Sequence, residues 1–324
     1  MLAVAERERN NQGGIGSMFS VRILGNSSAT PAYGRFTSSQ VVTFNDRYFL
    51  IDCGEGTQMQ LQKYHFKYSR IDALFISHLH GDHVLGAPGL LSSLSIYERT
   101  KPLPVFAPRG LMEILRMIFH FSDTVLKYEI EFHALEDFEP GEVLFSSDRL
   151  EVISIPLHHR SFCRGFIFRE KNKRRKFNFF KAKALEIPKE YFHLLKQERD
   201  VILTDGRVIL ANDLLFEREL PCSYAYCSDT MPDDALIEYI KDVTLLYHEA
   251  TFTHDMRDRA HETHHSTARD AGTVATKASV QRLIIGHFSA RYRDLAPLLE
   301  EARAIFPDTD LALEGLTFDL RKDE

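Results

Sequence analysis

The chain has 324 residues, of which 44% are hydrophobic and 27% charged, a mixture that excludes a disordered protein and suffices for a buried core. No stretch approaches the roughly 18 consecutive apolar residues of a membrane span, and a net charge of −6 does not indicate a polyanionic partner. Four cysteines without a C-x-x-C pair indicate a reducing compartment. We therefore expect a cytoplasmic protein that does not contact a membrane.

Short β-branched or aromatic runs alternate with helical patterns along the chain, which predicts a layered α/β fold. Residues 1–17 show no secretion signal and are predicted to be a disordered extension, so residues 18–324 would form a single domain. Strands are predicted at residues 19–24, 40–44, 48–52, 73–77, 105–107, 150–155, 165–168, 223–227, 244–248 and 282–286. Helices are predicted at residues 57–64, 84–97, 110–120, 235–240, 267–278 and 295–305.

A dense group of polar residues follows the predicted strand 73–77. His78, His80, Asp82 and His83 lie within six residues, immediately before an apolar helical run. Imidazole and carboxylate together suit zinc or another borderline divalent metal, whereas a hard cation would require oxygen ligands only. We interpret this group as a metal-binding loop.

Isolated histidine and aspartate residues follow three other predicted strands. These residues are His158 and His159, Asp229, and His287. Each alone would usually be a capped strand end, but together with the dense group they supply the seven ligands of a dinuclear site. Ligand chemistry alone does not choose between His158 and His159.

The combined pattern, His-x-His-x-Asp-His followed by His, Asp and His, resembles the metallo-β-lactamase superfamily, and within it the short-form ribonuclease Z family. Further matches are Leu24-Gly25 with Ser27, Asp52-Cys53-Gly54-Glu55-Gly56-Thr57-Gln58, Ser228-Asp229-Thr230, His248-Glu249-Ala250-Thr251-Phe252, His265-Ser266-Thr267 and His287-Phe288-Ser289-Ala290-Arg291-Tyr292. The resemblance spans nearly the whole chain from Met18. It implies a four-layer αββα sandwich with a protruding arm.

The resemblance also implies which residues bind two Zn²⁺ ions, or other divalent ions, in each subunit. His78, His80 and His159 would hold one ion, Asp82, His83 and His287 the other, and Asp229 would bridge them. His159 is preferred to His158 because it occupies the last place of the family pattern Pro-Leu-x-His.

By the same resemblance, the protein would be an endoribonuclease that removes the 3′ trailer from precursor tRNA. Asp82 would accept a proton from the attacking water. His265 would protonate the leaving 3′ oxygen, with Glu249 orienting its imidazole. Ser289 and Arg291 would hold a phosphate.

A basic segment lies where the family carries its tRNA-binding arm, which we place at about residues 169–220. Between Arg164 and Lys183 there are nine lysine or arginine residues and one acid. Such runs are usually solvated loops, but here the resemblance implies phosphate contacts by Lys171, Lys173, Arg174, Arg175 and Lys176. It also implies a homodimer in which the arm of one subunit serves the site of the other.

Other functions remain open at this point. The same metal site could act on a small ester or a cyclic phosphodiester, although the basic arm favours RNA. A non-catalytic RNA-binding scaffold conflicts with the complete ligand set. A diiron redox enzyme would resemble a His-x-Glu-x-Asp pattern, whereas this chain has His80 in the middle position.

Overall fold

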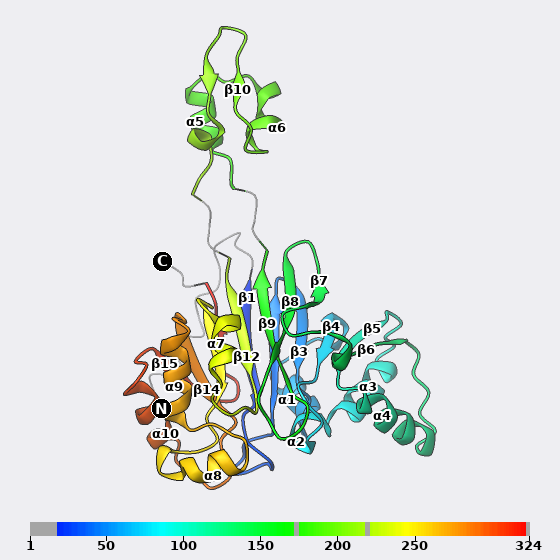
Figure 1. The fold of residues 1–324 in the computed structure, drawn as a ribbon. Coiled ribbons are helices and arrows are strands. Elements are labelled where there is room, and N and C mark those ends of the chain that lie inside the picture. The colour runs from blue at the N-terminus through cyan, green and yellow to red at the C-terminus, as the bar shows by residue number, and fades with distance from the viewer. Residues whose placement is uncertain (1–17, 172–174, 218–220, 322–324) are drawn as a thin grey trace.

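The computed structural model describes residues 18–171, 175–217 and 221–321. Within them, two seven-stranded mixed sheets stand face to face, with helices on both outer faces (Figure 1). The predicted αββα sandwich is therefore confirmed. No helix of these described residues is both long enough and apolar enough to cross a membrane.

The first sheet is built from the N-terminal half and one C-terminal strand. Its order is β16-β1-β2-β3-β4-β5-β6. The strands are β1 (Phe19–Gly25), β2 (Ser39–Phe44), β3 (Arg47–Ile51), β4 (Ile71–Phe75), β5 (Leu103–Ala107), β6 (Ile130–Ala134) and β16 (Thr317–Asp319). Its outer face is covered by α1 (Thr57–Lys63), α2 (Gly81–Val84), α3 (Ala87–Ile96) and α4 (Gly110–Phe121).

The second sheet follows the order β15-β14-β13-β12-β9-β8-β7. Its strands are β7 (Val143–Ser146), β8 (Leu150–Pro156), β9 (Arg164–Glu170), β12 (Ser223–Cys227), β13 (Leu245–Glu249), β14 (Arg282–Gly286) and β15 (Thr309–Leu311). The helices of this half are α7 (Asp234–Ile240), α8 (Arg257–Glu262), α9 (Ala268–Lys277) and α10 (Ala296–Arg303).

The main core lies between the two sheets and is rich in aromatic rings. Phe75 packs against Phe106 with ring centroids 4.9 Å apart, and against Phe166 and Phe168 of the opposite sheet at 5.4 Å each. These rings are at most 2% exposed. Burying them stabilises the sandwich and makes the sheet edges a rigid platform for loops.

A segment between β9 and β12 projects away from the sandwich (Figure 1). It contains α5 (Phe179–Ala184), α6 (Phe192–Leu195), β10 (Val201–Ile202) and β11 (Val208–Ile209), and has a small apolar core of its own. Arg169 and Glu170 still belong to β9, so the projecting segment begins after Glu170, slightly later than predicted. We call this segment the arm.

The structure contains several elements that were not predicted, including α5, α6, α8, β10 and β11. Short strands such as β6, β7, β15 and β16 lack a strong apolar pattern and were not predicted, because they lie at or near sheet edges. The predicted helix 84–97 corresponds to α3, and a break near Gly86 separates α3 from the short α2, which ends at Val84. A Cβ at Gly86 would lie 2.2 Å from the carbonyl oxygen of Gly54, so glycine permits a close backbone approach there.

Candidate metal centre

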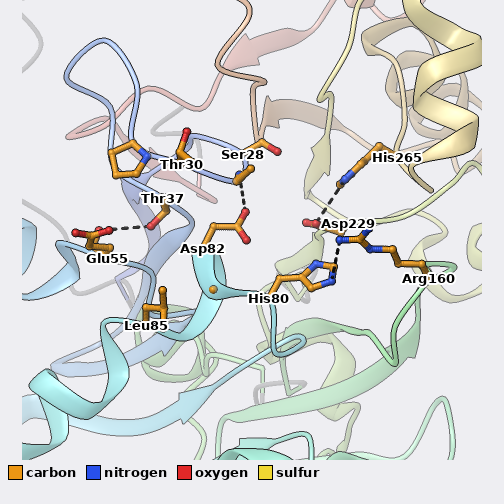
Figure 2. Close-up of a pocket in the computed structure, with 13 residues that line it drawn as sticks. Ser28, Thr30, Thr37, Glu55, His80, Asp82, Leu85, Arg160, Asp229 and His265 are labelled. Carbon is orange, nitrogen blue, oxygen red and sulfur yellow. Dashed lines mark hydrogen bonds and ion pairs between the residues drawn. The ribbon is translucent and has the colours of Figure 1, made fainter.

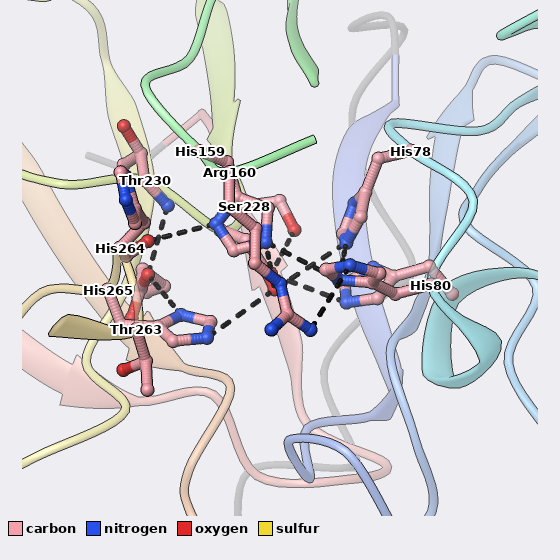
Figure 3. A network of polar contacts seen from close by, with 12 residues as sticks. His78, His80, His159, Arg160, Ser228, Thr230, Thr263, His264 and His265 are labelled. Carbon is pink, nitrogen blue, oxygen red and sulfur yellow. Dashed lines mark hydrogen bonds and ion pairs between the residues drawn. The ribbon is translucent and has the colours of Figure 1, made fainter. Parts of the chain in front are cut away.

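The predicted ligands come from four strand ends that meet at one edge of the sandwich. β4 leads to His78 and His80, and α2 carries Asp82 and His83. β8, β12 and β14 lead to the other three, which are His159, Asp229 and His287. Figure 3 shows His78, His80 and His159 converging from different segments.

The predicted ligands form two groups at this edge, each with its atoms within 4.8 Å of one another, and a third such group joins Asp229 and His287 to His265. In the first, Nδ1 of His80 lies 3.0 Å from Nε2 of His78 and 3.4 Å from Nε2 of His159. In the second, Nε2 of His287 lies 3.3 Å from both Nε2 of His83 and Oδ2 of Asp82.

Asp229 connects the two groups. Its Oδ2 lies 3.6 Å from Nε2 of His78, while its Oδ1 lies 3.3 Å from Nε2 of both His83 and His287. The carboxylate is 2% exposed. One carboxylate therefore faces both groups, as a bridging ligand must.

The hydrogen bonds around four of the five histidines favour metal binding through Nε2. The Nδ1 of His83 faces a carboxylate of Asp52 at 2.8 Å, and that of His159 faces the carbonyl of His264 at 2.9 Å. These oxygens can only accept, so Nδ1 carries the proton and Nε2 keeps its lone pair.

Two hydroxyl groups likewise accept a hydrogen bond from Nδ1 of His78 and of His287, which leaves Nε2 of each ring available to a metal. Ser77 donates to Asp52 at 2.9 Å and therefore accepts from Nδ1 of His78 at 3.0 Å. Thr251 donates to a carboxylate oxygen of Glu249 at 2.6 Å and accepts from Nδ1 of His287 at 2.9 Å. The donor set thus fits two divalent cations in its chemistry and in its tautomers.

The protonation states of the first group and of the carboxylates fit the same role. Burial lowers the pKa of His78, His80 and His159, which favours the neutral imidazole that a metal requires. Burial alone would raise the pKa of Asp82 and Asp229, but neighbouring histidines outweigh it and hold both well below the usual range. Both carboxylates are therefore ionised.

Glu249 and His265 form a second functional pair beside the metal ligands. Nδ1 of His265 lies 2.8 Å from Oε1 of Glu249, which is fully buried. Burial lowers the pKa of His265, but the charge and hydrogen bond of Glu249 outweigh it and raise the pKa to about 9. In the metal-free protein His265 is therefore cationic at neutral pH.

A cavity of about 480 Å³ opens onto these groups. Figure 2 shows Asp82, His80, Asp229 and His265 around it, with Arg160 on the same side as His265. The remaining walls come from the loop after β1, the segment before α1 and the two ends of α2, and they are Ser28, Ala29, Thr30, Pro31, Thr37, Glu55, Gly81 and Leu85.

Other predicted residues lie at or beyond the rim of the site. The side chain of His158 is exposed, and its backbone N–H donates to Thr230 at 3.0 Å. Ser289 is half-buried and Arg291 exposed, and neither belongs to the described residues that line the cavity. They follow His287 directly in the sequence.

The arm residues have differing environments. Lys173 and Arg174 lie outside the described residues. Lys171 donates to Ser146 at 2.6 Å, and Arg175 donates to Asn212 at 2.6 Å. Lys176 is exposed.

Sequence reasoning assigned no role to three residues that the structure brings to the centre, namely Asp52, Thr251 and Arg160. Asp52 accepts hydrogen bonds from Ser77, His83 and Tyr226. Asp52 and Thr251 belong to motifs that carry the resemblance, so the sequence could have indicated that they lie at the site. Arg160 had only its place beside His159.

The two sheets and the paired ligand groups define a metallohydrolase of the metallo-β-lactamase fold. Ribonuclease Z of Bacteroides fragilis strain YCH46 is 42% identical over 307 residues, covering 93% of this chain and 99% of the relative. Ribonuclease Z of Cytophaga hutchinsonii is 44% identical over 305 residues, covering 93% and 96%. The chain belongs to the ribonuclease Z family.

Structural and family-model comparisons cover different parts of the chain. The crystal structure of human tRNase Z, short form, is 25% identical, with a TM-score of 0.67, 94% of this chain covered and 100% of that chain. A family model described as anti-Pycsar protein Apyc1 matches residues 19–139. That region ends before the Glu249–His265 pair and before the arm.

Proposed function

We propose that the protein is a metal-dependent endoribonuclease that removes the 3′ trailer of precursor tRNA, leaving a 3′-hydroxyl tRNA and a 5′-phosphate trailer. The observation that carries this proposal is the cavity onto which both a two-metal ligand set and the Glu249–His265 pair open. Membership of the ribonuclease Z family supports the substrate.

The proposed metal content is two Zn²⁺ ions per subunit. His78, His80 and His159 would hold one ion, and Asp82, His83 and His287 the other, with Asp229 between them. Five imidazoles and two carboxylates suit zinc better than a hard cation. When bound, the ions would supply a nucleophilic water at neutral pH and neutralise charge on the phosphate.

The chain's own residues perform the proton transfers in this mechanism. Asp82 faces the cavity and accepts the proton of the attacking water. His265, held by Glu249, donates a proton to the leaving 3′ oxygen. Ser289 and Arg291, directly after His287, would contact a neighbouring phosphate.

The arm is proposed to bind tRNA away from the cleavage site, through contacts of Lys171, Lys173, Arg174, Arg175 and Lys176. β9 leaves the site edge at Arg164 and enters the arm after Glu170, and β12 returns from Ser223 to Cys227, two residues before Asp229 (Figure 1). The arm and the metal centre therefore lie at opposite ends of these strands. This placement supports a homodimer in which one subunit's arm serves the other's site.

The decisive experiment is incubation of the purified protein with a 3′-extended precursor tRNA, followed by mapping of both product ends. We expect one cut on the 3′ side of the discriminator base, abolished by a chelator and restored by Zn²⁺. A parallel assay uses a cyclic nucleotide. Hydrolysis of the cyclic nucleotide without cleavage of the precursor would favour the small phosphodiester as substrate and contradict the proposal.

A further inference from the structure

His80 differs from the other four candidate histidine ligands in what its outer nitrogen faces. The others present Nδ1 to a carboxylate, a carbonyl or a hydroxyl oxygen. His80 instead turns Nδ1 toward the first ligand group, so Nε2 points outward. There it meets Nη2 of Arg160 at 3.5 Å, as Figure 3 shows.

With a cation bound to Nδ1 of His80, this contact would join two groups that can both only donate. An imidazole whose Nδ1 lone pair is used for a cation carries its proton on Nε2. A guanidinium has five N–H donors and no acceptor. Ligand histidines normally donate their outer N–H to an oxygen, and with a cation bound at Nδ1 the contact between His80 and Arg160 would lack that acceptor.

Arg160 itself lacks a counter-charge in the part of the chain that the structure describes. No ion pair with a carboxylate is formed there, and its contact with His80 is the hydrogen-bond contact of its side chain. Other arginines in the described ranges have such partners, for example Arg109 with Asp137. The Arg160 side chain is exposed and forms part of the cavity wall beside the metal ligands.

We propose that Nη2 of Arg160 and the Nε2–H of His80 together bind a non-bridging oxygen of the scissile phosphate. The inference rests on the proposed function, which places a phosphodiester in this cavity. Donor atoms 3.5 Å apart can share one oxygen at about 2.8 Å from each. We call this pair of donors the phosphate notch.

The position of the phosphate notch explains why it would select the scissile phosphate. His80 belongs to the ligand set, and Asp82, Asp229 and His265 line the same cavity. A phosphorus atom attacked between these groups gains negative charge on its non-bridging oxygens. A guanidinium already in place stabilises that charge without reorganisation.

The test compares Arg160→Ala and Arg160→Lys with the wild type, using Arg116→Ala as a control because Arg116 is exposed on α4. Zinc per chain is measured first, and it should be unchanged in every variant. Inorganic phosphate is then titrated calorimetrically into the zinc-loaded proteins. We expect Arg160→Ala to raise the phosphate Kd roughly 10- to 100-fold, and Arg160→Lys to recover part of the affinity by keeping the charge.

Hydrolysis of bis(p-nitrophenyl) phosphate and of precursor tRNA completes the test. Both kcat/KM values should fall with Arg160→Ala, because the two substrates share the scissile phosphate. An unchanged phosphate Kd overturns the phosphate notch. A loss on precursor tRNA alone also overturns it, by assigning Arg160 to another phosphate. The wild type could fail to cut precursor tRNA while Arg160→Ala still raises the phosphate Kd and still slows hydrolysis of bis(p-nitrophenyl) phosphate. In that case the proposed function fails and the phosphate notch stands.

Discussion

The hydroxyl of Thr251 lies 2.9 Å from Nδ1 of His287. The same hydroxyl donates to Glu249 at 2.6 Å, and Glu249 contacts His265. A candidate metal ligand is thereby joined through one buried hydroxyl to the Glu249–His265 pair, for which we propose the general-acid role. We therefore expect Thr251 to position His287 and Glu249.

Thr251→Val should weaken metal binding at the second ligand group. Valine has nearly the same shape but cannot accept the proton of Nδ1, so the orientation and tautomer of His287 are no longer held. We expect zinc affinity to fall about 10- to 100-fold, the usual effect of losing such a partner, measured by competition with a chromophoric chelator. Thr251→Ser keeps the hydroxyl and should stay near wild type; a serine variant as weak as the valine variant would refute this role.

His265→Ala should leave the zinc count intact and slow precursor cleavage by about 10²- to 10⁴-fold, the size of a general-acid contribution. The defect should be smaller for an activated aryl phosphodiester, whose leaving group needs no proton. Single-turnover rates on both substrates measure the difference. Equal losses on the two substrates would argue for a structural role of His265.

The pH dependence of cleavage follows from the raised pKa of His265. The protonated form of His265 predominates below its pKa of about 9, so kcat should fall as the pH rises through that value. Bound cations would lower this pKa and move the alkaline limb of the pH profile to lower pH. Glu249→Gln removes the charge that raises the pKa and should shift the alkaline limb further down. A limb at the same pH in both proteins would mean that another group controls it.

Asp229→Ala should reduce the zinc content below two ions per chain, because this carboxylate faces both ligand groups. Elemental analysis of protein purified without chelators counts the metal, and circular dichroism checks that the variant is folded. One ion or none in folded wild-type protein would contradict the dinuclear proposal.

Neutralising exposed arm lysines should weaken precursor binding without affecting the metal centre. Lys176, Lys181 and Lys183 are exposed, and changing them to Gln should flatten the salt dependence by about 0.9 in logarithmic slope for each duplex phosphate that the arm no longer neutralises. Hydrolysis of bis(p-nitrophenyl) phosphate should be unchanged. The matched control changes Lys63, Lys67 and Lys241 on the sandwich. Equal effects of the two triple variants would remove the arm from tRNA binding.

The exposed face of α4 is the surface on which we expect a second copy to pack. Ile114, Met117, Ile118 and Phe121 follow helical spacing, and Phe121 is 81% exposed, which is unusual for an isolated soluble chain. Met117→Glu with Phe121→Glu should convert a dimer to a monomer in light scattering. The control is Glu113→Gln on the same helix. A wild-type monomer at micromolar concentration would contradict the homodimer.

Much of the fold could be predicted because strong local patterns coincide with the buried strands and helices. The strand at Ser223–Cys227 and the one at Arg282–Gly286 have the predicted bounds, since both are mostly apolar runs paired with a strand on each side. Edge strands such as β7 depend on pairing with a neighbour rather than on their own residues. The sequence could not reveal that pairing.

For the candidate site, the sequence by itself supplied the ligand types, because His78 to His83 form a motif and the other ligands follow apolar strands. Only the tertiary structure decided which nitrogen of each histidine faces inward, since that depends on partners distant in sequence, such as Asp52 for His83 and Thr251 for His287. It also brought Arg160 against His80, 80 residues away. Spacing along the chain encodes residue chemistry, whereas the direction of a hydrogen bond exists only after the sheets have packed.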